Sequence, residues 1–256
     1  MLTDTHSHIH FSWEFPDIDE ILQNAEKAKV TRQIIVGCTP KDSFLALEFV
    51  KKYENRQFWS TLGVHPHHAN ELSNEILEKF RSFAKSEEQI VAFGEIGLDY
   101  YRNLQPPEIQ QRAFRRQLQL ALELDFPVIV HVREAWDDAL KIMEEEGNRK
   151  VILHCFTADL KVAELAWQRG YFTSFSGVLT YPKNKYLRDV ALAAPKERLL
   201  IETDCPYLTP QIYRGQRNEP AFLAATAEEL ARIKGLSLGQ IADLTTQNAI
   251  RAFGLR

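Results

Sequence analysis

The sequence predicts an α/β protein, built as a single (β/α)8 barrel (the TIM barrel) over residues 1–256 with extra C-terminal helices. Three observations lead to this prediction. Eight short apolar runs alternate with longer amphipathic segments along the chain. No Asn-Gly or Asp-Gly turn separates the runs, which favours parallel strands joined by helical crossovers over hairpins. A length of 256 residues is also typical of this barrel.

Each predicted strand is an apolar run, and each is followed by a segment with helical spacing of its apolar residues. In the first helix, Ile18, Ile21, Leu22 and Ala25 fall on one face. A doubly wound open sheet is the alternative, but it needs a glycine-rich loop after the first strand, and residues 7–11 contain no glycine. The predicted strands are residues 1–8, 33–38, 58–64, 89–93, 127–132, 151–154, 171–175 and 199–203, and the helices are 17–29, 41–53, 73–84, 108–124, 134–146, 159–168, 185–193, 220–233 and 237–253.

Composition excludes several classes of protein. The formal net charge of −4 argues against a protein that grips long nucleic acid by bulk electrostatics, so any nucleic-acid contact must be local. The three cysteines are far apart and form no Cys-x-x-Cys pair, which favours a reducing compartment over a disulfide framework. No signal peptide or membrane-spanning run is recognisable, so a cytoplasmic protein without membrane contact is expected. No obligate protein partner can be inferred.

Polar residues that could bind a metal or take part in catalysis follow the predicted strands. Active sites of (β/α)8 barrels lie at the carboxyl ends of the strands, so these residues are expected to meet there. In chain order they are His6 and His8, His65, Glu95, His131 and Arg133, His154, and finally Glu202 with Asp204. The remaining histidines, His10, His67 and His68, are expected to be solvated loop residues.

Six of these groups predict a centre for two divalent metal ions. Imidazole nitrogen and carboxylate oxygen are ordinary ligands for such ions, and one carboxylate can bridge a pair. We expect Glu95 to be the bridge, and we expect Asp204 to orient or deprotonate a water, so these two are the predicted catalytic residues. The alternative is a buried salt-bridge network with packing histidines. The predicted ligands of the first ion are His6, His8, Glu95 and Asp204, and those of the second are Glu95, His131 and His154.

A series of motifs in fixed order carries a resemblance to a known family. It includes Thr-His-Ser-His at residues 5–8, Gly-Val-His-Pro at 63–66, Gly-Glu-Ile-Gly-Leu-Asp at 94–99 and Glu-Thr-Asp-Cys-Pro at 202–206. The series resembles that of the TatD family of metal-dependent hydrolases, which belongs to the amidohydrolase superfamily and has a TIM barrel fold. The family's metal ligands match the same six residues listed above. The resemblance implies a Mg²⁺-dependent deoxyribonuclease, often a 3′–5′ exonuclease, whereas imidazole ligands favour Zn²⁺, Mn²⁺ or Ni²⁺.

The predicted substrate is a DNA end or a short single strand, cleaved at a phosphodiester bond. Its contacts are assigned to His65, Arg133, Glu202 and Asn218. For Arg133 the alternative is a rim salt bridge with Glu134 or Asp137, and Glu202 could instead orient a ligand histidine. Two other functions stay open. One is hydrolysis of an ester or amide, for example by a D-aminoacyl-tRNA deacylase, because fold does not fix function. The other is a non-catalytic, metal-bound scaffold.

Overall fold

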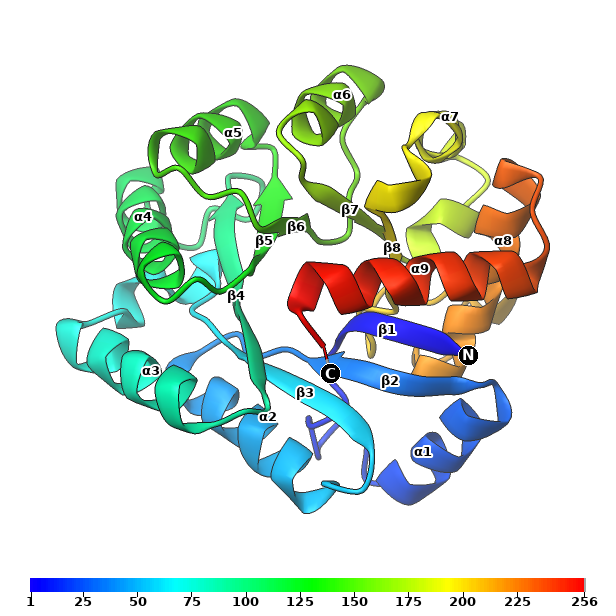
Figure 1. Cartoon of the computed structure of the whole chain (residues 1–256), viewed down its shortest axis with the longest axis horizontal. Coiled ribbons are helices and arrows are strands. Elements are labelled where there is room, and N and C mark those ends of the chain that lie inside the picture. The colour runs from blue at the N-terminus through cyan, green and yellow to red at the C-terminus, as the bar shows by residue number, and fades with distance from the viewer. Residues whose placement is uncertain (256) are drawn as a thin grey trace.

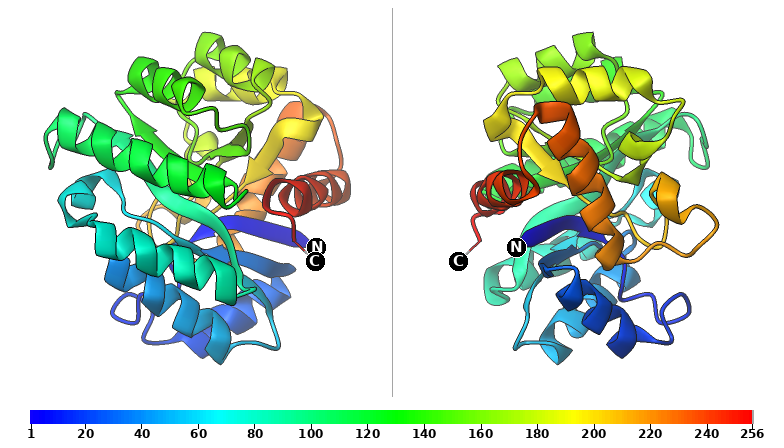
Figure 2. Two further views of the ribbon diagram at one scale, coloured as in Figure 1. Left: turned by 60° about the vertical axis from the view of Figure 1, so that its left-hand side comes forward. Right: turned by 90° about the vertical axis from the view of Figure 1, so that its right-hand side faces the viewer.

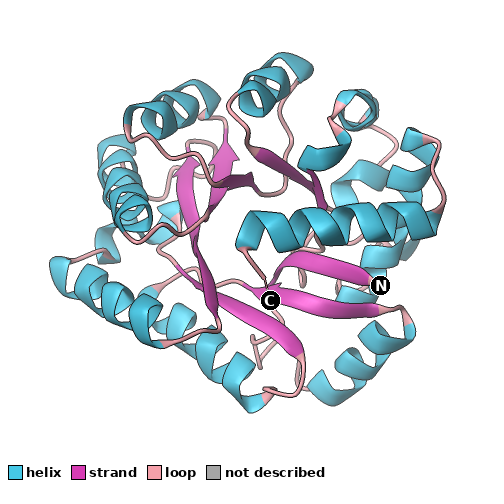
Figure 3. Cartoon of the chain, viewed as in Figure 1, coloured by secondary structure: helices cyan, strands magenta, loops and turns pink. Residues whose placement is uncertain are grey.

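The computed structural model describes residues 1–255, and the predicted eight-stranded barrel is confirmed over that range. Eight parallel strands form one sheet in sequence order, β1 to β8, surrounded by helices (Figures 1 and 3). The predicted single domain ends at residue 256, which lies outside the described residues. The strands are β1 (Leu2–Ser7), β2 (Val30–Ile35), β3 (Gln57–Leu62), β4 (Ile90–Asp99), β5 (Val128–Arg133), β6 (Val151–Leu153), β7 (Phe172–Phe175) and β8 (Leu199–Ile201).

Within residues 1–255, seven α-helices connect successive strands and two follow the last strand. The helices lie outside the strands in both views of Figure 2. Their starts follow local capping chemistry. Thr39, Ser73 and Asp159 each accept a backbone N–H with the side chain, and Ser237 forms a capping box with Gln240. The helices are α1 (Ile18–Lys27), α2 (Pro40–Lys52), α3 (Asn74–Ser86), α4 (Pro107–Glu123), α5 (Trp136–Glu145), α6 (Leu160–Gln168), α7 (Lys185–Ala193), α8 (Leu223–Lys234) and α9 (Leu238–Phe253).

Strand β4 departs from the sequence prediction, which ended it at Phe93 and placed Glu95 in a loop. The strand continues to Asp99, with an irregular register against β5 between Phe93 and Ile96. Gly94 and Gly97 have φ values of 156° and 141°, and a Cβ on Gly97 would lie 2.0 Å from the His131 carbonyl oxygen. The glycines therefore permit a close, irregular strand pairing that resembles a loop in the sequence. Glu95 consequently stands on a hydrogen-bonded strand.

The barrel closes between β1 and the segment that follows β8. The Asp204 N–H donates to the His6 carbonyl and the His8 N–H donates to the Cys205 carbonyl, both at 2.9 Å. Below this closure the Thr5 hydroxyl donates to the Ile201 carbonyl at 3.0 Å. The closing bonds involve the backbone of three predicted metal ligands, so formation of the barrel also sets the spacing of these ligands.

Helix α9 covers the amino-terminal end of the barrel, next to the start of β1 (Figure 1). The amide of Asn248 donates to the carbonyls of Lys196 and Leu199 at the start of β8, and Thr246 bonds to Thr3 in β1. Buried side chains of β2, β4, β5, β6 and β8 cluster with Phe253 near the end of α9. This apolar cluster therefore lies at the end of the barrel away from the polar carboxyl ends of the strands. No helix in residues 1–255 has the length and apolar character that a bilayer crossing requires.

We expect Phe253→Ala to lower the free energy of unfolding by about 3–5 kcal/mol, because the truncation leaves a cavity beneath the strands. Urea unfolding followed by circular dichroism would measure the change. Leu122→Ala in α4 is the control, because Leu122 is half exposed and should change the stability by less than about 0.5 kcal/mol. A Phe253 variant as stable as this control would contradict the packing described.

Candidate metal centre

Glu95 lies at the middle of the polar strand ends and its two carboxylate oxygens face different groups. Oε1 lies 2.9 Å from His131 Nδ1, 3.0 Å from His154 Nε2 and 3.5 Å from His65 Nε2. Oε2 lies 3.5 Å from His6 Nε2 and accepts the Cys38 thiol at 3.5 Å. One buried carboxylate thus separates two clusters of ring nitrogens.

The first cluster lies between β1 and the segment after β8. His6 Nε2 and His8 Nε2 are 3.2 Å apart, and Asp204 Oδ1 lies 3.7 Å and 3.5 Å from them, respectively. His6 also stacks on His154 at a centroid distance of 3.9 Å, which brings the two clusters into contact. Among residues 1–255 there are four triplets in which the three candidate ligand atoms lie within 4.8 Å of one another. They are His6–Glu95–His154, His6–His8–Asp204, His8–Cys38–Glu95 and His65–Glu95–His131.

The outer nitrogens of three imidazoles face acceptor oxygens, which turns the inner nitrogens toward the carboxylates of the site. Burial opposes the charged form, but the neighbouring carboxylates raise the pKa of His8, His131 and His154, so a metal ion would replace a proton on these inner nitrogens. His8 Nδ1 donates to the Val36 carbonyl at 2.8 Å, and His154 Nδ1 donates to Glu202 Oε1 at 3.0 Å. In His131 the roles of the two nitrogens are reversed: Nε2 lies 3.2 Å from Asp99 Oδ2, and Nδ1 faces Glu95. Carbonyls and carboxylates that accept from the distal nitrogen in this way are the usual supports of metal-binding histidines.

The electrostatics of the site favour ionised carboxylates. Burial opposes the charge of Glu95, but the surrounding imidazoles, with His154 and His65 foremost, hold its pKa well below the usual range. The pKa of Asp204 is also lowered, since the effect of burial is outweighed by His8, His154 and His6. Burial lowers the pKa of His65 to about 4 and lowers that of His6 as well. These two imidazoles are therefore neutral near pH 7, the form in which a ring nitrogen binds a metal.

The chemistry of these donors fits divalent transition metals. Imidazole nitrogens and ionised carboxylate oxygens converge on shared points, and both are ordinary ligands of such ions. The thiol of Cys38 is a further donor that the sequence patterns did not indicate. Its only sequence signal is its position three residues after β2.

Asp4 anchors the segment that carries Asp204. Its Oδ1 accepts the Thr203 N–H at 2.9 Å and the His6 N–H at 3.2 Å, and its Oδ2 accepts the Thr203 hydroxyl at 2.5 Å. Complete burial raises the pKa of Asp4 to about 7, although these hydrogen bonds oppose the shift. The carboxyl of Asp4 therefore links β1 to the loop after β8, directly below His6.

The predicted substrate contacts lie in different places. His65 is at the centre, against Glu95, whereas Arg133 is exposed at the end of β5 with its guanidinium 3.8 Å from the Tyr101 ring centroid. The alternative ion pair of Arg133 with Glu134 or Asp137 is not formed among residues 1–255. Glu202 is buried against His154 and Cys155, the arrangement anticipated for a residue that orients a ligand.

Asn218 is fully buried, and its amide is occupied by the protein. Nδ2 donates to the carbonyls of Thr203 and Tyr207 at 2.9 Å and 2.5 Å, and Oδ1 accepts the Glu219 N–H at 3.0 Å. Its predicted role in substrate binding gains no support from this placement. The geometry gives it a different one, because the two carbonyls flank Asp204 and their hydrogen bonds fix the loop around that residue.

The three histidines expected to be solvated have different environments. His68 is exposed and pairs with Glu71, as expected. His67 bonds instead to the buried carboxylate of Asp99 at 2.9 Å. His10 is wrongly predicted, because it is buried and bonds to Asp42 at 2.9 Å. Asp42 also accepts the Cys38 N–H, so it couples the loop after β1 to the loop after β2.

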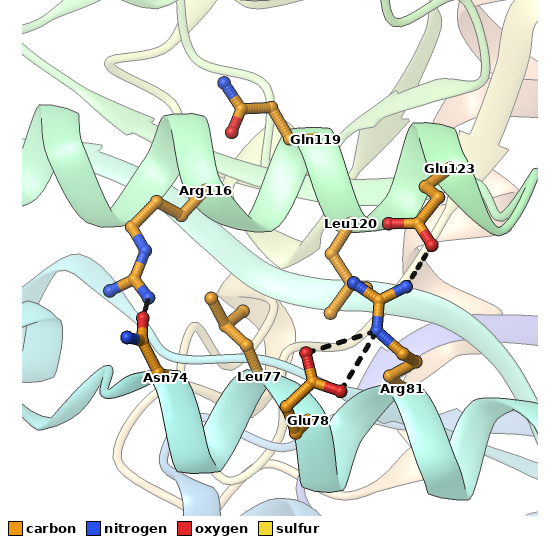
Figure 4. A pocket seen from close by; sticks show the side chains of 8 residues that line it. All are labelled: Asn74, Leu77, Glu78, Arg81, Arg116, Gln119, Leu120 and Glu123. Carbon is orange, nitrogen blue, oxygen red and sulfur yellow. Dashed lines mark hydrogen bonds and ion pairs between the residues drawn. The ribbon is translucent and has the colours of Figure 1, made fainter.

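A shallow groove lies on the outer surface, between α3 and α4 (Figure 4). Arg81 pairs there with Glu78 and Glu123, and Arg116 donates to Asn74. Each arginine there donates to a neighbouring acceptor of the protein, and the groove lies on the helices rather than at the strand ends. This groove is therefore a packing feature of two neighbouring helices.

Known proteins match nearly the whole length of the chain. The family model for TatD related DNase matches residues 3–254. The chain belongs to the TatD family. It is 38% identical to an uncharacterized metal-dependent hydrolase of Bacillus subtilis over 99% of both chains. It is 37% identical to the 3′-5′ ssDNA/RNA exonuclease TatD of Erwinia tasmaniensis, over 93% of this chain and 94% of that protein. The TatD homologue YJJV of Escherichia coli superposes with a TM-score of 0.92 at 29% identity, over 100% and 98% of the chains.

Membership in the TatD family confirms the predicted relationship and makes the chain a metal-dependent hydrolase. Curated relatives with this description cover nearly the whole chain, and the groups that could bind metal lie where barrel enzymes place their active sites.

We expect Glu202→Gln to weaken binding of divalent metal by about 10- to 100-fold, because the neutral amide holds His154 less firmly in its tautomer and orientation. Titration of the chelator-treated protein with Zn²⁺ or Mn²⁺ in a calorimeter would measure the loss. Glu71→Gln, a change at an exposed carboxylate, is the matched control. Equal affinity in the two variants would rule out this role of Glu202.

The pKa of Asp4 makes stability depend on pH. The folded pKa of about 7 lies above the unfolded value of about 3.9, so the folded state binds more protons between these values and stability falls as pH rises from about 4 to 7. In chelator, the wild type should lose on the order of 3 kcal/mol more than Asp4→Asn over this window. Urea midpoints at pH 5 and 7.5 would measure the difference, and parallel pH profiles would contradict the expectation.

Proposed function

We propose that this TatD-family hydrolase is a deoxyribonuclease that cleaves phosphodiester bonds stepwise from the 3′ end of a single strand, with two divalent ions at the barrel mouth. The observation that carries the two-ion site is the position of Glu95 between two clusters of nitrogen and oxygen donors, with one carboxylate oxygen facing each cluster. The name of the Erwinia relative favours this substrate class.

We assign the six predicted ligands to two positions. His6, His8 and Asp204 would hold one ion together with Glu95 Oε2, and His131 and His154 would hold the other with Glu95 Oε1. When bound, such ions lower the pKa of water and offset the charge that develops on phosphoryl oxygens. The histidine-rich donor set favours Zn²⁺, Mn²⁺ or Ni²⁺, while the resemblance to the family implies Mg²⁺, so the working ion must be identified by reconstitution.

The protein side chains supply the proton transfer and the positioning. The carboxylate of Asp204 stays ionised and lies at the edge of the first cluster, where it can accept a proton from an attacking water or orient that water. Arg133 presents an exposed guanidinium at the end of β5. Its flat face is used by the Tyr101 ring, so its N–H edges are available for a phosphate. His65, from the loop after β3, lies at the centre beside Glu95.

The deciding experiment compares substrates on metal-reconstituted protein. Labelled single strands, duplexes with blunt or recessed ends, and carboxylic esters including a D-aminoacyl-tRNA would each be incubated with Mg²⁺, Mn²⁺ or Zn²⁺. The proposal predicts a ladder of products shortened from the 3′ end of the single strand, and loss of the ladder in chelator. Ester hydrolysis without nuclease activity would assign the alternative function.

We expect Asp204→Asn to reduce the rate of cleavage by about 10²- to 10⁴-fold while metal is retained, because the amide cannot accept the proton. Rates would be measured on the single strand, and metal content by elemental analysis. Glu71→Gln, at an exposed carboxylate that pairs only with His68 among the described residues, is the control. Full activity of the metal-loaded Asp204 variant would remove this residue from catalysis.

A further inference from the structure

An ordered row of aromatic rings leads from the candidate metal centre to solvent. The rings of His8 and Phe11 stack at a centroid distance of 5.1 Å with an interplanar angle of 11°. Phe11 and Trp13 stack in turn at 4.6 Å and 18°. All three belong to the end of β1 and the loop that follows it. The row is therefore a continuous stack of nearly parallel planes, and its inner end is a candidate metal ligand.

The outer end of the row is open. Trp13 is 66% exposed, whereas Phe11 is only 8% exposed, so Trp13 covers Phe11 and leaves much of its own surface free. Tyr207, from the loop after β8, is 55% exposed and stands at an angle to His8 at a centroid distance of 6.3 Å. The mouth therefore has a large exposed aromatic surface beside its polar centre. Because the net charge of the chain is −4, contact with a nucleic acid is not expected to depend on bulk electrostatic attraction.

We propose that the row of His8, Phe11 and Trp13 is a platform on which a nucleobase of a single-stranded substrate stacks, beside the phosphate at the metal centre. This inference rests on the proposed nuclease function and extends it to the recognition of the base. Planar bases extend a parallel aromatic stack, and every base has such a face, so the platform binds without sequence preference. Bases inside a duplex are covered by their neighbours, so the platform also favours single strands.

The opposite rim of the mouth complements this platform. Arg133 lies on the far side, at the end of β5, with its guanidinium over the Tyr101 ring. A nucleotide has one planar apolar part and one anionic part, and the mouth offers an aromatic surface on the β1 side and a cation on the β5 side. An apolar peptide or an acyl chain would match the aromatic surface and leave the arginine without a partner.

The test compares Trp13→Ala with the wild type on three thymidine tetranucleotides. One carries all its bases, one has an abasic residue at the 3′ end, and one has an abasic residue at the penultimate position. Affinity is measured by fluorescence anisotropy on uncleavable phosphorothioate versions, and kcat and KM are measured on the natural linkages. Leu122→Ala, at an exposed apolar residue on α4, is the control.

With the complete oligonucleotide, we expect Trp13→Ala to weaken binding and raise KM by roughly 5- to 100-fold, the range typical of loss of one stacked base. Trp13→Tyr should restore most of the affinity, because it keeps a planar ring. One of the abasic oligonucleotides should bind the wild type as weakly as the complete oligonucleotide binds Trp13→Ala. The affinity of that abasic oligonucleotide for Trp13→Ala should be the same as its affinity for the wild type.

The platform is refuted if Trp13→Ala and Leu122→Ala bind the complete oligonucleotide equally, or if Trp13→Ala weakens all three oligonucleotides by the same factor. Cleavage by the wild type separates the two proposals. A wild type that degrades single strands while the Trp13 variants are unaffected overturns the platform alone. A wild type that neither binds nor cleaves any oligonucleotide overturns the nuclease function and, with it, the platform.

Discussion

Closure of the barrel between β1 and the segment after β8 is the constraint on which the rest of the site depends. Two backbone hydrogen bonds connect His6 to Asp204 and His8 to Cys205, and the buried carboxyl of Asp4 reinforces them through Thr203. Residues nearly 200 positions apart in sequence therefore meet at fixed spacing only when the last strand has docked on the first. We infer that the first donor cluster does not exist in a partly folded chain.

The second cluster depends on a different local feature, the irregular pairing of β4 with β5. Gly97 lies so close to the His131 backbone that any side chain would collide with it, and this approach brings Glu95 and His131 to 2.9 Å. Several charged and polar groups are buried together here, which is costly unless each has a partner. The imidazoles partly compensate the Glu95 carboxylate, and a bound cation would complete the compensation.

The sequence predicted the parts of the site that follow from strand order alone. His6, His131, His154 and Asp204 could be placed together because parallel strands of one barrel end on the same face. The true extent of β4 was missed, because Gly94 and Gly97 have the composition of a loop although they lie in a strand. The partners of His10 and His67 were also missed, since each is a carboxylate 32 positions away. Asp42 lies in the first turn of α2 and Asp99 at the end of β4, and their approach to the two histidines is set by tertiary packing.

The two rims of the mouth have different chemistry, and this difference bears on how a substrate would lie. The loop after β1 contributes the aromatic ring of Trp13. The loop after β8 contributes the carboxylate of Asp204 and the ring of Tyr207. The exposed cation, Arg133, comes from the end of β5, across the barrel. A single strand with its base on Trp13 and a phosphate toward Arg133 would span the mouth from the β1 side to the β5 side. The asymmetry of the barrel mouth would then set on which side of the mouth the bases lie, without contact to any particular base.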